Sequence, residues 1–503
     1  MADKEYGVML HGRLPIYTTI EGFDPNDEDS IIAEVNSALS IHGTNIFAME
    51  YLYWYRRGLT PIYNKTKEVR PEINHKVSVN LAQSVVDFKN GYFLTQPAFY
   101  ISRKEDEEVT EKVKQINEYL YVSGKQQADN ELVDWFHTVG KADLYVEPND
   151  DDEVPYKAYA LDPRSAFVVR SLNAGNPVVY GVHAVTKDKT LYMDVWDKDW
   201  VYKLEGTKVA DIATPIPMYT YTASAVVDKR PNVLGSVPII EYQYNSVGMS
   251  AFEAVIPLLD AINDLQSGRL DSVDQFVQSL LIFYNCELGQ DEDGNEITTK
   301  MVREAGALFL KSIGENKADV KELSSVLDQG QTQVLVDDLY KQVLRICGMP
   351  DNSAGGTAFT GTAVELRDGW ELASMNARNT EDLFKKSNRE FDKIVLKILR
   401  GKGLLDINLN DFALNFTRTE VDNIQSKAQA YTALVGGGMH PILAMQKTGV
   451  SADPVGDYEM SKGYMKLRWG DPDAPKVEEK MEEEIPSETI EEGEQGSMGD
   501  GAI

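Results

Sequence analysis

Apolar residues along this chain recur at two different spacings, and the changes between these spacings divide it into elements. Over residues 74–94 they lie three or four positions apart, which predicts a helix that ends before Pro97. From residue 142 the spacing changes to two, and six short strands separated by Gly, Asp, Asn and Pro are predicted within residues 142–204. Residues 237–242 are the last predicted strand of this group. Strands grouped in this way predict an antiparallel sheet in an α+β fold.

Before the first of these helices, residues 1–45 are predicted to be a polar, weakly structured arm with a short helix near residues 29–39. An aromatic-rich segment follows at residues 46–57, and its rings are expected to lie in a core or at a subunit contact rather than to stack on bases.

The second half of the chain is dominated by long helical patterns. Residues 250–276 and 327–347 are predicted helices, and the residues between them, 280–325, read as short strands with a short helix at 299–304. A small α+β module is therefore inserted between two helices.

A flexible loop and a very long helix follow. Gly348 and Pro350 end the preceding helix, residues 351–362 are rich in Gly, Thr and Ser, and a helical pattern without Pro runs over residues 363–400. At 1.5 Å per residue such a helix is about 57 Å long. A rod of this length beside a flexible loop is expected in a ring that holds a polymer in its bore, and few compact enzymes need one.

The C-terminal part is predicted to contain one strand and three amphipathic helices, at residues 412–418, 422–434, 441–447 and 454–466. Beyond them, residues 471–503 hold 12 acidic residues against 2 lysines, a composition typical of a disordered tail.

The net charge of the whole chain is −30, of which this tail contributes −10. The remaining 470 residues still carry −20 and contain no dense run of Lys or Arg. A tight nucleic-acid binder has basic patches, so this composition favours a protein that does not adhere to a polyanion.

Other features of the sequence exclude several classes. The longest apolar runs are too short to span a bilayer, and the N-terminus lacks the pattern of a signal peptide, so no membrane association is expected. Cys286 and Cys347 are the only cysteines, which suits a reducing compartment, and the six histidines form no zinc pattern.

The motifs that resemble ligand sites are incomplete. Gly356 and Gly361 have phosphate-loop spacing, but Thr362 stands where Lys is needed and the loop follows a helix. Asp291 and its neighbours begin like a calcium loop, yet Glu296 replaces the required Gly. Paired carboxylates such as Asp260 with Asp264 and Asp337 with Asp338 suit solvated helix faces better than a catalytic dyad. No catalytic residue, cofactor or metal is therefore expected.

The order of these parts resembles that of the portal (head-to-tail connector) proteins of tailed double-stranded-DNA bacteriophages, siphovirus type. The resemblance rests on the aromatic segment with Arg56-Arg57-Gly58, the segment at residues 74–97, Asp162-Pro163-Arg164, the strand at 237–242 and Phe416-Thr417-Arg418-Thr419. It covers nearly the whole chain.

This resemblance implies a phage-portal-like fold with an α/β wing, long stem helices, a small α+β clip and an α-helical crown. The implied parts are an N-terminal arm (1–45), wing (46–249), stem helix (250–276), clip (277–325), second stem helix (326–348), tunnel loop (349–362), long wing helix (363–403), wing strand (404–419), crown (420–470) and acidic disordered tail (471–503).

It also implies which residues carry the function. The stem helix would pack in the ring through an apolar face made by Val255, Leu258, Leu259, Ile262 and Leu265. The tunnel loop would face DNA through Asn352, Ser353, Gly355, Gly356, Thr357, Phe359, Thr360, Gly361 and Thr362.

The implied protein is not an enzyme. It would form a ring, usually of twelve subunits, at one capsid vertex of the virion, after assembly in the host cytoplasm. DNA would pass through its channel during packaging and ejection, and its partners would be the terminase large subunit, the head-completion (adaptor) protein and the major capsid and scaffolding proteins. An intracellular α+β enzyme with an unrecognised site, or another virion structural protein, remains the alternative.

Overall fold

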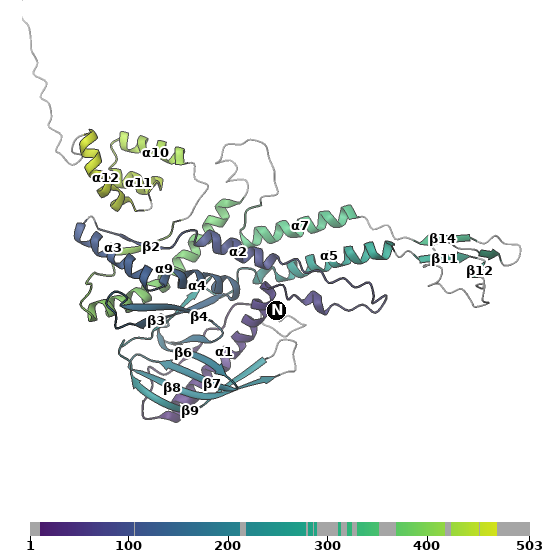
Figure 1. Cartoon of the computed structure of the whole chain (residues 1–503), viewed down its shortest axis with the longest axis horizontal. Coiled ribbons are helices and arrows are strands. Elements are labelled where there is room, and N and C mark those ends of the chain that lie inside the picture. The colour runs from purple at the N-terminus through teal and green to yellow at the C-terminus, as the bar shows by residue number, and fades with distance from the viewer. Residues whose placement is uncertain are drawn as a thin grey trace, which may run out of the picture.

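The computed structural model describes residues 11–104, 106–211, 218–277, 280–284, 286–288, 310–312, 319–323, 329–351, 369–417, 424–451 and 453–469. Figure 1 shows a broad body of sheets and helices, a pair of helices that projects from it toward a small strand module, and a separate group of short helices. The α+β class predicted from the sequence is confirmed.

The larger sheet of the body has six strands in the order β1-β5-β6-β7-β8-β9. β1 pairs in parallel with β5, and the other neighbours are antiparallel. One long helix, α1, contributes Ile31, Val35 and Leu39 to the core of this sheet. The bounds of these elements are β1 (Tyr17–Thr18), α1 (Glu28–Arg56), β5 (Ala166–Ser171), β6 (Val178–Lys187), β7 (Thr190–Trp196), β8 (Trp200–Asp211) and β9 (Met218–Pro231).

The helix expected near residues 29–39 is present, but the rest of the predicted arm is more ordered than expected over the described residues 11–45. Ile16 is buried under the sheet, and α1 runs without interruption through the expected boundary at residue 45. Gly43 and Asn45 are poor helix formers, but Asn45 lies in the interior, where it bonds the backbone of Leu14 in both directions at 2.8 and 2.9 Å. Tertiary contacts of this kind hold the helix together where local propensity is weak.

A second, smaller sheet has the order β10-β3-β4. With α3, α4 and α9 it encloses the largest core among the described residues. The prediction of one antiparallel sheet was therefore wrong: its strands belong to two sheets, and β9 was not predicted. The bounds are β3 (Lys141–Pro148), β4 (Tyr156–Leu161), β10 (Ile239–Gln243), α3 (Glu107–Val122), α4 (Lys125–Val139) and α9 (Trp370–Gly401), with β2 (Phe99–Ser102) and β15 (Phe412–Asn415) paired beside them.

The helix predicted over residues 74–94 begins later, as α2 (Leu81–Phe93). Residues 75–79 are instead held along the projecting helix α5 (Ile256–Val277). The backbone N–H groups of His75, Val77 and Val79 donate to the side chains of Asp271, Ser267 and Asn263 at 2.7, 2.9 and 2.7 Å. Two residues of extended chain advance by about 6.6 Å, and four residues of helix advance by about 6.0 Å. Every second amide of residues 75–79 therefore lies beside every fourth side chain of this face of α5.

The projecting pair consists of α5, which follows a short helix η2 (Glu253–Val255), and α7 (Gln329–Cys347). Beyond them β11 (Leu280–Tyr284) pairs with β14 (Asp319–Leu323), and β12 (Cys286–Leu288) pairs with β13 (Leu310–Ser312). The strand module expected between two helices is thus present, while its predicted helix at residues 299–304 lies outside the described residues. Another short helix, η1 (Pro61–Asn64), contacts α5.

The last described helices are α10 (Ile424–Gly436), α11 (Pro441–Thr448) and α12 (Pro454–Trp469), close to the three predicted ones. A small core of Ile442, Val455 and Tyr458 joins α11 to α12. No described helix has the length and apolar character needed to cross a membrane.

Candidate functional site at the ends of the loop between α7 and α9

The loop between α7 and α9 is the predicted DNA-facing site, and the structure describes its two ends. Asn352, Ser353, Gly355, Gly356, Thr357, Phe359, Thr360, Gly361 and Thr362 all lie outside the described residues. The structure describes the end of α7 as far as Asp351, and the chain again from Gly369. The long helix begins at Trp370, so its described length of 32 residues is about 48 Å rather than 57 Å.

The end of α7 is fixed by a glycine in a left-handed conformation. Gly348 has φ of +62°, and the next amide, of Met349, donates to the Leu344 carbonyl at 2.8 Å. A Cβ atom on Gly348 would lie 2.0 Å from Nδ2 of Asn376, in the first turns of α9. A larger residue would force the Asn376 side chain to move, and glycine is favoured here above all because it adopts the left-handed conformation at little cost.

The start of α9 is held by aromatic side chains of α2. Gly369 has φ of +85° and turns the chain into the helix. The ring of the next residue, Trp370, has its centroid 6.1 Å from that of Phe88 and 5.8 Å from that of Tyr92, and the latter two rings stack at 5.7 Å. α2 thus positions the point at which the loop returns to the body.

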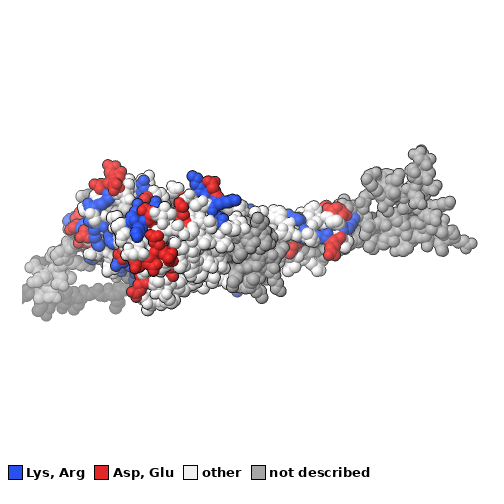
Figure 2. All heavy atoms as spheres, turned by 90° about the horizontal axis from the view of Figure 1, so that it is seen from below, with Lys and Arg blue, Asp and Glu red and all other residues white. Residues whose placement is uncertain are grey.

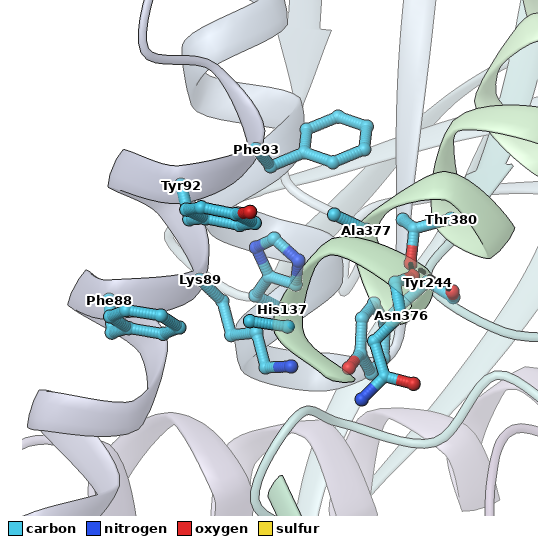
Figure 3. Close-up of a pocket in the computed structure, with 10 residues that line it drawn as sticks. Phe88, Lys89, Tyr92, Phe93, His137, Tyr244, Asn376, Ala377 and Thr380 are labelled. Carbon is cyan, nitrogen blue, oxygen red and sulfur yellow. Dashed lines mark hydrogen bonds between the residues drawn. The ribbon is translucent and has the colours of Figure 1, made fainter. Parts of the chain in front are cut away.

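Beside the first turns of α9 lies a small cavity, shown in Figure 3. Its volume is about 10 Å³, which is room for roughly one water molecule. Its walls come from α2, α4, α9 and the residue that follows β10. Its lining residues are Phe88, Lys89, Tyr92, Phe93, His137, Tyr244, Ala373, Asn376, Ala377 and Thr380. A cavity of this size cannot hold an organic substrate, so its residues act on the packing of the junction.

Two titratable groups of the junction have shifted pKa values because they are buried. Burial lowers the pKa of Lys89 to about 8, and it raises the pKa of the nearby Cys347 thiol to about 11. His137 is fully buried beside Lys89. Burial is the main cause that holds the pKa of His137 well below its ordinary value, and the positive charges of Lys89 and Arg56 lower it further. His137 is therefore neutral, and Lys89 is the charged group of the junction at neutral pH.

Lys89→Met should stabilise the protein below pH 8, because it removes a buried charge. The pKa of Lys89 is about 8 in the folded chain against 10.5 unfolded, so the unfolded chain binds the proton more tightly. Wild-type stability therefore rises with pH between these values. The variant's advantage should be about 3 kcal/mol at pH 7 and vanish near pH 10.5. Urea unfolding at both pH values checks this, and a pH-independent difference would contradict it.

The stem face predicted to meet other subunits is covered by the chain itself. Val255, Leu259 and Ile262 are 0, 1 and 2% exposed and belong to a core shared with α1, α2 and α7. Leu258 packs partly buried on that core, and Leu265 is half-buried. Assigning this face to contacts between subunits was wrong for the three buried residues, because helical spacing alone does not distinguish the two kinds of burial.

The hairpin of α5 and α7 exposes other apolar side chains, which the sequence analysis did not identify. Val334 is 69% exposed and Ile346 is 55% exposed on α7, and Val273 is 48% exposed on α5. Leu270 and Leu335 are similarly open. In the sequence they could have been found as apolar residues that lie outside the helical spacing of the buried face of each helix. Exposed apolar groups on a two-helix projection favour contact with another chain.

The charged side chains of the described residues form no continuous basic band on the face shown in Figure 2, where Lys and Arg alternate with Asp and Glu over the body and the hairpin. Within the described part of the chain, no group of His, Cys, Asp and Glu could hold a metal ion. The geometry therefore supports a scaffold with exposed apolar faces and a loop fixed at both ends.

Comparison with known proteins agrees with this interpretation. The profile of a family described as "Phage portal protein, SPP1 Gp6-like" matches residues 42–450. The portal protein of Bacillus phage SPP1 is 22% identical over 397 residues, which cover 76% of this chain and 73% of that protein. The chain therefore belongs to the SPP1 Gp6-like phage portal proteins, a family of structural proteins and not of enzymes.

Proposed function

We propose that about twelve copies of this chain form a ring at one vertex of the phage capsid, with a channel through which double-stranded DNA passes during packaging and ejection. The observation that carries this proposal is the hairpin of α5 and α7, which projects from the body with apolar side chains exposed on both helices (Figure 1). A monomer leaves these groups in water, whereas neighbours in a ring bury them.

The proposed channel does not bind the DNA tightly. The chain carries −30, so a bore lined by such subunits repels phosphate and lets the duplex slide. The loop between α7 and α9 contacts the DNA, and the junction at Gly348 and Trp370 holds its two ends on the rigid body. In this arrangement residues 46–249 and 404–419 form the wing, α5 and α7 the stem, residues 277–325 the clip and residues 420–470 the crown.

The proposed partners follow from the position at the vertex. The clip binds the terminase large subunit during packaging and the head-completion (adaptor) protein afterwards, and the wing meets the major capsid and scaffolding proteins. Assembly takes place in the host cytoplasm before the DNA enters.

Images of the negatively stained, purified chain test the proposal. We expect rings with a central hole, and native mass spectrometry should give about 0.67 MDa for twelve copies of the 56.2 kDa chain. A ring with one subunit more or fewer would still agree with the proposed function. Monomers and dimers alone, at all protein concentrations, would refute the ring.

Replacing the clip should separate its role from that of the body. Leu280 pairs with Leu323, so the two ends of the module lie on adjacent strands and a short Gly/Ser link can join the stem helices. The ring should still form, because the buried side chains described for the body cores all come from outside the module. Binding of terminase in a pull-down should be lost, and undiminished binding would place the docking site elsewhere.

A further inference from the structure

A cavity of about 1100 Å³ opens in the body between α9, β10 and the segment that precedes β1. Its walls come from residues 11–17, from the start of β6, from residues 235–247 and from one stripe of α9 that runs from Leu383 to Lys397. This volume lies above the range of roughly 300–1,000 Å³ usual for small-molecule pockets. The cavity is therefore large enough to hold a short stretch of polypeptide.

This cavity is basic although the chain is acidic. Seven lysines and arginines line it against two glutamates. One of the seven, Arg13, is paired with the buried Glu253 behind the wall, which leaves an excess of four positive charges. Glu241 accepts from both Lys141 and Arg170, at 3.5 and 3.1 Å, and so only partly neutralises them. The second acid, Glu390, pairs with Lys393 at 2.7 Å.

Three cations of the cavity are left over. Within the described residues, no carboxylate lies within ion-pair distance of Lys198, Lys386 or Lys397. Among the described residues, Lys397 donates to the carbonyl of Gly235, at 3.2 Å. Unpaired cations gathered around one opening attract a ligand with several negative charges.

The chain itself contains a segment of this chemistry. Residues 478–494 hold nine glutamates and one lysine. The segment follows α12, which contacts β2, and Tyr100 of β2 bonds Asp392 on α9, the helix that forms the cavity wall. About eight residues separate the end of α12 from Glu478, enough to reach about 27 Å, and the segment itself extends for about 55 Å more.

We propose that the glutamate-rich segment, residues 478–494, binds in the basic cavity between α9, β10 and the segment before β1. The glutamates pair with the lysines of the α9 stripe and with Lys198. Occupation of the cavity shields its cations from DNA phosphate, and so keeps the body from retaining the polymer that the proposed ring must release. The binding itself does not depend on ring formation.

Carbodiimide cross-linking of the full chain, followed by peptide mass spectrometry, tests this, because the reagent joins a carboxylate to an amine in direct contact. We expect links from Lys386 and Lys397 to Glu482–Glu494. K386E/K397E should reduce the links of Lys198 to this segment at least tenfold. Combining K386E/K397E with E482K/E483K/E484K places carboxylates in the cavity and amines on the segment. Cross-links between the two should then form again. The control K112E makes the same charge change outside the cavity, at a partly buried lysine of α3, and should leave the links unchanged.

Several results would overturn the proposal. One is a set of cross-links that joins the glutamates to lysines outside the cavity. Another is a yield that falls equally in K386E/K397E and in K112E. If DNA rather than the segment occupies the cavity, the links will be missing in the wild type and K386E/K397E will retard less DNA in gels. Circular dichroism on each variant checks that the substitutions leave the fold intact.

Discussion

Glu253→Ala is expected to reduce the free energy of unfolding by about 3–5 kcal/mol, the range found when one partner of a buried ion pair is removed. Glu253 lies in η2, just before the stem helix α5, and it pairs with Arg13 at 2.8 Å. The two side chains are 0 and 2% exposed. Glu253 also accepts the amides of Gly12 and Ser250, at 3.0 and 2.8 Å, so the substitution leaves several polar groups without an acceptor.

The cost is large because Arg13 is already poorly solvated. Its Nε and Nη1 are buried with no hydrogen-bond partner, and burial lowers its pKa despite the neighbouring carboxylate. Without Glu253 the guanidinium charge has no compensation in its surroundings. The residues before β1 should then detach from the base of the stem, which would loosen the junction between body and hairpin.

Urea unfolding of Glu253→Ala, compared with the wild type and with an Arg13→Met/Glu253→Leu double variant, checks this expectation. The double variant removes both charges and fills their space, so it should recover most of the loss. A loss below about 1 kcal/mol in the single variant would mean that water enters and replaces the carboxylate. A double variant as unstable as the single one would point to packing rather than to charge.

The parts of the fold that were predictable from the sequence are those set by local pattern. The strands between residues 142 and 204, the module between α5 and α7 and the three C-terminal helices were all found close to their expected positions. In β4 and β7, for example, buried and more open side chains alternate, as the period-two spacing predicts. The portal family itself was recognisable from the order of the parts, and the family match over residues 42–450 confirms it.

The parts that were not predictable depend on partners far away in the sequence. Residues 75–79 have helical spacing, but Asn263, Ser267 and Asp271 hold them extended, and nothing local in residues 74–94 indicates those partners. Period-two spacing likewise predicts strands without saying which strands pair, so two sheets were read as one.

The candidate site shows the same limit. The glycines around the loop were visible in the sequence, but the contact between Gly348 and Asn376 and the stacking of Trp370 on α2 bring together segments that are distant in the chain. The stem helix is the clearest case. Val255 and Val334 are both apolar residues of helical segments, yet the first is 0% and the second 69% exposed.

Val334→Asp/Leu335→Asp should abolish the ring while leaving the subunit folded. The two side chains are 69 and 47% exposed in the single chain, so the substitution costs the subunit itself little, about 0.5 kcal/mol or less. In a ring the same surface repeats at every contact between neighbours, so two carboxylates per subunit enter each interface without a partner. Native mass spectrometry should therefore show monomers, and thermal melting should be close to that of the wild type.

Two control variants separate assembly from folding in this experiment. Val233→Asp makes the same change at a body residue that is 93% exposed, and its rings should remain intact. Val336→Asp places the charge on the buried stripe of α7, where the side chain is 6% exposed, so it should unfold the hairpin as well as prevent assembly. Intact rings from Val334→Asp/Leu335→Asp would show that α7 does not face a neighbour. The contacts between subunits would then have to lie on the wing or the crown, where α12 exposes Met460 and Leu467 by 80 and 89%.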